Sequence, residues 1–253
     1  NLIGFNMKLY RYFSIILLFT LLSPAVNLFA QQDYVPELYM AEVKGGNYVT
    51  GTKISVVILD FNISIAEVDQ KLWTEVMGYN PSNPVGDDLP VNNIQWLSAV
   101  EFCNKLSTIM GYPLVYTIEE NGDVFADMTV KGIRLPTEEE WEYAAKGGNQ
   151  SQGFKYAGSN NPDEVAWYFN NSSKKIHPVG SKMPNELGLF DMSGNVAEWT
   201  FDTDAKNSNN RILKGGTWNS KVSLLTPNSR TSVSVESVPD ERVGLRVAVS
   251  MDR

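Results

Sequence analysis

The stretch at residues 188–199, GLFDMSGNVAEW, holds the residue types best suited to chemistry in this chain. Its two carboxylates, Asp191 and Glu198, flank Gly194 and Asn195, which favour sharp turns. A turn between two carboxylates can gather side-chain and backbone oxygens, and hard cations such as Ca²⁺ prefer a set of oxygen ligands. The same carboxylates could instead accept hydrogen bonds from the loop amides, in which case they would only support the loop.

Thiol and imidazole chemistry have few candidates, because Cys103 is the only cysteine and His177 the only histidine. An intramolecular disulfide and a thiol-pair metal site are therefore excluded. Cys103 falls in the apolar stripe of an expected helix, and we interpret it as a small core residue rather than a nucleophile. His177 precedes a proline, and we interpret it as a residue at a strand edge.

The acidic run at residues 138–140 could suggest a catalytic carboxylate cluster. It follows Thr137, however, and Thr137 with Glu140 forms a capping box at the start of a helix. Acidic residues in a first helical turn also complement the helix dipole. We therefore expect these carboxylates to stabilise a helix N-terminus.

Helical periodicity predicts two more helices in the first half of the chain. One spans about residues 96–110, and its apolar stripe is Trp96, Val100, Cys103, Leu106 and Met110. The other opens at a second capping box, Ser64 with Glu67, and ends at Gly78.

Short strands are predicted over residues 53–61, 211–214 and 245–249, and a hairpin over 112–130 turns at 120–123. No long helix is expected after Gly147. Helices in the first half and loop-supported strands in the second predict the α+β fold class.

Residues 7–30 have the pattern of a secretory signal peptide. Residues 7–11 carry two basic side chains, residues 13–22 are almost wholly apolar, and Ala30 offers a cleavage point before Gln31. The apolar run is too short to favour a full membrane span, and an uncleaved anchor is the alternative. We expect an exported protein (periplasmic, cell-surface or secreted) with no transmembrane anchor after signal removal.

The domain prediction follows from this pattern and from the composition. Residues 1–6 precede Met7, the expected start residue, so residues 1–30 are assigned to upstream sequence and signal, and residues 31–253 to a single domain. The chain is 43% hydrophobic, enough for a sizeable core. Its net charge of −8, with no basic cluster, argues against nucleic acid as a partner.

Five sequence blocks occur in the order typical of one family. They are FNISIAEVDQKLWTEVMGYNPS (61–82), PVNNIQWLSAVEFCNKLS (90–107), GIRLPTEEEWEYAAKGG (132–148), GLFDMSGNVAEW (188–199) and LKGGTW (213–218), and GLRV (244–247) closes the pattern. Over residues 40–250 the chain resembles the formylglycine-generating enzyme family, also called sulfatase-modifying factor domains. The resemblance implies a C-type-lectin-like fold with a few helices, short antiparallel strands and much irregular loop.

The resemblance also implies structural calcium. Carried over by position, Asp191 and Glu198 would bind the ion by their side chains, and Gly194 and Val196 by backbone carbonyls. The family's second calcium site belongs to a segment that is shortened here, around residues 164–171, and is not carried over.

Copper is not expected. Active members of the family bind copper through two cysteines after the glycine-glycine-aromatic block, and counting from Trp218 places Ser220 and Leu225 at those positions. Neither side chain supplies the soft thiolate that Cu(I) requires. A related branch uses iron held by several histidines, which one histidine cannot provide.

We therefore expect a non-catalytic domain that binds a small molecule, a glycan or a protein through its C-terminal loops. The candidate ligand-binding residues are Trp218, Asn219, Ser220, Arg230 and Arg242. Trp218 could offer a sugar platform, although core packing is the alternative for it as for the other tryptophans.

Two other functions remain open. One is a cysteine-independent enzyme of the same superfamily that performs oxidative tailoring with Glu198, Asp202, Arg230 and Arg242, although the arginines could equally pair with loop carboxylates. The other is a variable ligand-binding protein of a diversity-generating retroelement, because those proteins end in a similar pattern.

Overall fold

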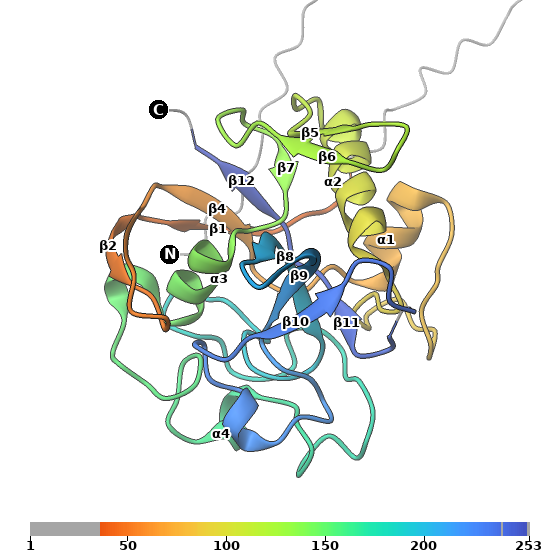
Figure 1. The fold of residues 1–253 in the computed structure, drawn as a ribbon. Helices are drawn as coiled ribbons and strands as arrows, with labels where there is room; N and C mark the ends of the chain where they lie inside the picture. The colour runs from red at the N-terminus through yellow and green to blue at the C-terminus, as the bar shows by residue number, and fades with distance from the viewer. Residues whose placement is uncertain (1–35, 239, 252–253) are drawn as a thin grey trace, which may run out of the picture.

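Two four-stranded sheets form the framework of this computed structural model, which describes residues 36–238 and 240–251 (Figure 1). The first sheet has the order β1-β4-β12-β7 and is antiparallel throughout. Its strands are β1 (Met40–Val43), β4 (Phe61–Ser64), β12 (Ala248–Ser250) and β7 (Ile133–Arg134). The sheet therefore joins the first strands of the described chain to the last one.

The second sheet has the order β10-β9-β8-β11. Its strands are β8 (Ala197–Asp204), β9 (Asn207–Lys214), β10 (Thr231–Ser234) and β11 (Val243–Gly244). β11 runs parallel to β8, whereas the other pairs are antiparallel. Two small hairpins complete the strands: β2 (Gly46–Val49) with β3 (Ser55–Ile58), and β5 (Tyr116–Ile118) with β6 (Val124–Ala126).

The helices are α1 (Gln70–Met77), α2 (Trp96–Met110), α3 (Glu138–Ala145) and α4 (Pro162–Val165), with short 3-10 turns η1 (Gly148–Gln150) and η2 (Val222–Leu224). α2 has the predicted bounds. α3 begins at the predicted capping box, in which Thr137 accepts from the backbone of Glu140 and Glu140 accepts from that of Thr137. The predicted hairpin and the α+β class are confirmed as well.

The predicted start of the first helix is wrong. Ser64 ends β4, and α1 begins only after Asp69, whose side chain accepts a hydrogen bond from the backbone of Leu72. The capping box fails because Glu67 is turned into the core, where its carboxylate accepts hydrogen bonds from a distant loop. The end at Gly78 is as predicted, in a left-handed conformation that glycine tolerates.

The largest core cluster takes side chains from α1, α2 and strands of both sheets, and Figure 1 shows the two helices side by side. Trp73 and Phe102 stack there with ring centroids 5.0 Å apart. Cys103 is fully buried in this cluster, as expected of a core residue. A second cluster under α3 centres on Trp141 and Phe61.

Residues 166–196 contain no helix or extended strand, only turns and isolated bridges, so hydrogen bonds and buried side chains must hold this loop region in place. Within the described ranges, no helix has the length and apolar character needed to cross a membrane. The predicted signal peptide at residues 7–30 lies outside the described residues.

Candidate functional site

The loop at residues 188–196 turns sharply before it enters β8. Asp191, Gly194 and Asn195 all have positive φ angles, 57°, 85° and 54°. The Gly194 amide donates to the carbonyl of Gly215 at 2.9 Å, and the Asn195 amide donates to that of Trp167 at 2.8 Å. The turn formers seen in the sequence therefore bring the loop against two other backbone segments.

A fully buried ion pair lies behind this loop. The Arg246 guanidinium binds both oxygens of Glu198, with Nε–Oε2 at 2.6 Å and Nη2–Oε1 at 2.7 Å, and neither side chain is exposed. The indole Nε1 of Trp141 also donates to Glu198 Oε2 at 2.5 Å. Both carboxylate oxygens of Glu198 are thus engaged.

Two more carboxylates lie close to this pair. Glu67 accepts from Asn195 Nδ2 at 2.7 Å and from the Val196 amide at 3.0 Å. Asp191 Oδ2 accepts from the Gly180 amide at 2.6 Å, whereas Asp191 Oδ1 is buried and has no hydrogen-bond partner. Asp191 thus accepts a backbone amide, as the alternative to calcium binding expects, whereas Glu198 binds Arg246 and Trp141 rather than a loop amide.

Burial dominates the protonation of these acids. It raises the pKa of Glu67 well above its usual value, and the nearby carboxylates of Asp191 and Glu198 add to this. Burial also raises the pKa of Asp191, to about 6, against the hydrogen bond from Gly180. Because all three acids are sealed from solvent, acid–base catalysis on a dissolved substrate is not what this geometry supports.

Sequence reasoning missed Glu67 and Arg246 in this network. Each is a charged residue inside an apolar run, IAEV and GLRVAV, and charged side chains are almost never fully buried unless they are paired. That pattern could have suggested a buried ion pair, but not which partners meet.

Glu198, one of the predicted calcium ligands, is held by contacts that a calcium ion would have to replace. Asp191, Gly194, Val196 and Glu198 are brought together by the loop, yet Glu198 is taken by Arg246 and Trp141. A dication bound to Glu198 would also lie beside a guanidinium and be repelled by it. Among the described residues, no group of three or more His, Cys, Asp or Glu side chains is placed to hold a metal. Calcium therefore stays a prediction, and it would require Glu198 to leave Arg246.

A cleft of about 670 Å³ lies on the second sheet, where the C-terminal loops cover it. Its floor takes one residue from each of the four strands, namely Ala197, Leu213, Val233 and Val243. The rest of its lining comes from two chain segments, one with Gly216, Thr217, Asn219, Ser220, Lys221, Leu224, Ser229, Arg230 and Thr231, the first residue of β10, and the other with Ser237, Val238, Asp240 and Arg242. The cleft has an apolar floor and a polar wall, as ligand sites commonly do.

Four of the five predicted ligand-binding residues line this cleft: Asn219, Ser220, Arg230 and Arg242. Trp218 does not. It is 8% exposed and packs against Ile176, Val196 and Leu89, below the loop that it starts. Trp218 therefore packs in the core, which was the alternative to its use as a sugar-binding platform.

The two positions that would carry copper-binding cysteines are filled by structural side chains. Ser220 Oγ accepts from the Thr217 amide at 2.9 Å and so closes a tight turn. Leu225 is fully buried in a small cluster with Tyr156 and Tyr168. The second position therefore belongs to the core and is closed to a ligand.

The polar residues considered for a cysteine-independent enzyme are held in ion pairs or hydrogen bonds. Arg230 lies 3.3 Å from Glu138 and 3.9 Å from Asp204, and Arg242 binds Asp240 through its Nε at 2.8 Å. Asp202 accepts from the Glu138 amide at 2.5 Å. This arrangement favours loop support over catalysis for these groups.

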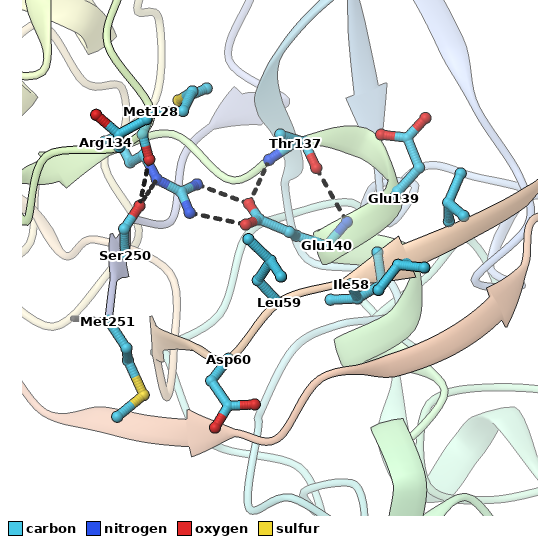
Figure 2. A pocket seen from close by; sticks show the side chains of 13 residues that line it. Ile58, Leu59, Asp60, Met128, Arg134, Thr137, Glu139, Glu140, Ser250 and Met251 are labelled. Atoms are coloured by element: carbon cyan, nitrogen blue, oxygen red, sulfur yellow. Dashed lines mark hydrogen bonds and ion pairs between the residues drawn. The ribbon is translucent and has the colours of Figure 1, made fainter. Parts of the chain in front are cut away.

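A second pocket, of about 610 Å³, lies between β3 and the start of α3. Figure 2 shows that its polar centre is the pair Arg134–Glu140, with Nη1–Oε2 at 2.6 Å and Nη2–Oε1 at 2.7 Å. Glu140 also accepts from the Thr137 amide. The prediction that this acidic run stabilises a helix start is therefore confirmed for Glu140.

Comparisons with known proteins agree with this geometry. Residues 28–251 match the model of the sulfatase-modifying factor enzyme 1-like domain. The chaperone protein LppX of Paenibacillus barcinonensis is 40% identical over 219 residues, which cover 71% of this chain and 78% of that protein. The inactive C-alpha-formylglycine-generating enzyme 2 of Bos taurus is 29% identical over 65% of this chain and 59% of its own length.

A solved structure, variable protein 1 of Treponema denticola, superposes with a TM-score of 0.77 at 30% identity and covers 84% of this chain and 95% of that one. The C-type-lectin-like fold expected from the resemblance is thereby confirmed. From the extent of the family match, the collinear motifs and this fold, the chain belongs to the formylglycine-generating enzyme family of sulfatase-modifying factor domains.

Proposed function

We propose that this chain is an exported, non-catalytic binding module whose C-terminal cleft takes a segment of another protein. The observation that carries the proposal is the cleft itself. Apolar strand residues form its floor, while the two copper-ligand positions hold the turn-closing Ser220 and the core residue Leu225. A cleft retained without the metal ligands favours binding over oxidation.

The exposed side chains of the cleft favour a protein segment over a small solute. Leu224 and Val238 stand at its walls with 46% and 87% of their surface exposed. Exposed apolar groups beside a polar rim are typical of sites that contact another macromolecule. Similarity to a protein named as a chaperone, and to one named as an inactive enzyme, supports the same choice.

A matched pair of variants tests the cleft. Leu224 and Val222 lie in the same short turn, η2, and both are exposed, but only Leu224 lines the cleft. The probe is fluorescently labelled, reduced and carboxymethylated α-lactalbumin, an unfolded polypeptide, and the readout is fluorescence anisotropy. We expect Leu224→Asp to weaken binding about fivefold or more, because burying a half-exposed leucine in the complex contributes about 1 kcal/mol of binding free energy, which the variant loses.

The control Val222→Asp should bind like the wild type. If both variants bind the probe equally well, the cleft is not the binding site. If the wild type does not bind the probe, an unfolded protein segment is not the ligand. Export rests on the signal pattern at residues 7–30, and N-terminal sequencing of the mature protein is expected to start at Gln31.

The similarity to a variable protein favours a second candidate, a variable ligand-binding protein. In that case the loop residues of the cleft walls would differ between near-copies of the gene, while the strand residues of the floor would not. A genomic neighbourhood without a reverse transcriptase gene and without a second near-copy of the region encoding residues 214–247 would exclude this candidate.

A further inference from the structure

The Arg246 guanidinium binds Glu198, one of the two side chains to which the resemblance assigns a metal ion, and it links separate chain segments as a metal would. It donates to Glu198 in β8, to the Ser64 carbonyl at the end of β4 at 3.0 Å, and to the Phe190 carbonyl of the loop at 2.9 Å. Arg246 itself lies between β11 and β12. One buried cation therefore ties both sheets to the loop at residues 188–196.

Three buried carboxyl groups, those of Glu67, Asp191 and Glu198, lie around this position. A buried carboxylate is very unfavourable unless a positive group or hydrogen bonds compensate it. Arg246 supplies the positive charge, and its planar guanidinium binds Glu198 through two parallel hydrogen bonds.

We propose that Arg246 is a built-in cation that takes the structural role of a metal ion at this loop, so that the protein folds and keeps its loop without calcium. Both carboxylate oxygens of Glu198, which a calcium ion would need, are already held by Arg246 and Trp141. This inference concerns the scaffold and is independent of what the cleft binds.

The first test uses the full-length wild-type protein. Elemental analysis after dialysis should find no calcium, and the melting temperature should be the same in a chelator and in millimolar calcium chloride. A specifically bound calcium ion at saturating concentration would raise the melting temperature by at least about 5 °C. Such a rise, or one equivalent of bound calcium, would overturn the proposal.

Variants test the interchange of guanidinium and metal directly. Arg246→Ala leaves the buried carboxylate of Glu198 without its cation, so we expect it to melt at least about 10 °C below the control Arg242→Ala, whose side chain is exposed. Added calcium should partly restore the melting temperature of Arg246→Ala and leave that of Arg242→Ala unchanged. A folded Arg246→Ala variant that melts like the control, or that does not respond to calcium, would contradict the proposal.

If Arg246→Ala does not fold, Arg246→Lys decides, because it keeps the positive charge. We expect Arg246→Lys to fold in the presence of chelator, with a lower melting temperature, since lysine cannot reproduce the paired hydrogen bonds. An Arg246→Lys protein that folds only when calcium is added would overturn the proposal.

Discussion

Replacing Gly194 by alanine tests whether the turn before β8 depends on the close approach of two backbones. Gly194 has a φ of 85°, and a Cβ there would lie 2.1 Å from the carbonyl oxygen of Trp167. Gly180, in the same loop region, has a φ of 70°, but its Cβ would meet no atom nearer than 3.9 Å. Gly180→Ala therefore carries the cost of a positive φ, about 1–2 kcal/mol, without the clash.

The magnitude follows from the distance that must be relieved. Ordinary Cβ contacts begin at 3.4 Å, so Gly194→Ala must push the two backbones apart by more than about 1 Å. That shift stretches the hydrogen bonds Asn195 N–Trp167 O and Gly194 N–Gly215 O, both 2.8–2.9 Å long. Each buried group left unpaired costs about 1–3 kcal/mol. We expect Gly194→Ala to lose about 2–5 kcal/mol more than Gly180→Ala.

Urea unfolding followed by tryptophan fluorescence measures this difference in the free energy of unfolding. The Trp218 amide donates to the Asn195 carbonyl, so a loosened turn should also weaken probe binding in the adjacent cleft. If the two alanine variants differ by less than about 1 kcal/mol, the backbone contact is not what holds this turn, and the reasoning is refuted.

Buried titratable groups give two further predictions. Burial raises the pKa of Asp202 to about 6, against the hydrogen bond from the Glu138 amide. The folded state then holds this proton more tightly than the unfolded state, so the contribution to stability is present below about pH 4 and is lost as the pH rises towards 6. The free energy of unfolding of Asp202→Asn, relative to that of the wild type, should thus rise by up to about 3 kcal/mol between pH 4 and pH 7. Urea unfolding measures it, and a difference between the two proteins that does not change with pH would contradict this. Burial also raises the pKa of the Cys103 thiol, so iodoacetamide at mildly alkaline pH should alkylate it only after denaturant is added, and rapid alkylation of the folded protein would contradict its core position.

Helices with complete local signals could be predicted from the sequence. α2 has a continuous apolar stripe, and α3 has a capping box whose two hydrogen bonds form as expected. The capping-box pattern at Ser64 and Glu67 was equally clear, but Glu67 bonds instead to Asn195, 128 residues away. No local pattern contains that partner, and a tertiary contact overrides the propensity for a helix start.

The candidate site was predicted in part. The C-terminal loops were identified through the family resemblance, and Asn219 and Ser220 do line the cleft. The floor could not be predicted, because it depends on β10 and β11 pairing with the two edges of a hairpin formed by β8 and β9. The first residues of β8 are all buried, so buried and exposed residues do not alternate along them. Without that alternation the sequence cannot indicate which face of the sheet a ligand could reach.

The buried loop and the cleft are parts of one structure. The loop turn accepts the Trp218 amide at Asn195, and its Gly194 amide binds Gly215, so the two ends of the GGTW segment are fixed by the loop. The Ser193 hydroxyl also donates to the Leu225 carbonyl at 2.8 Å. These contacts fix the wall of the cleft at its start, near Trp218, and at Leu225, where the chain returns to the core. We therefore expect that side chains between these two residues can change without unfolding the protein. This division explains how a chain can keep the family fold while a position used for copper in the family holds Ser220.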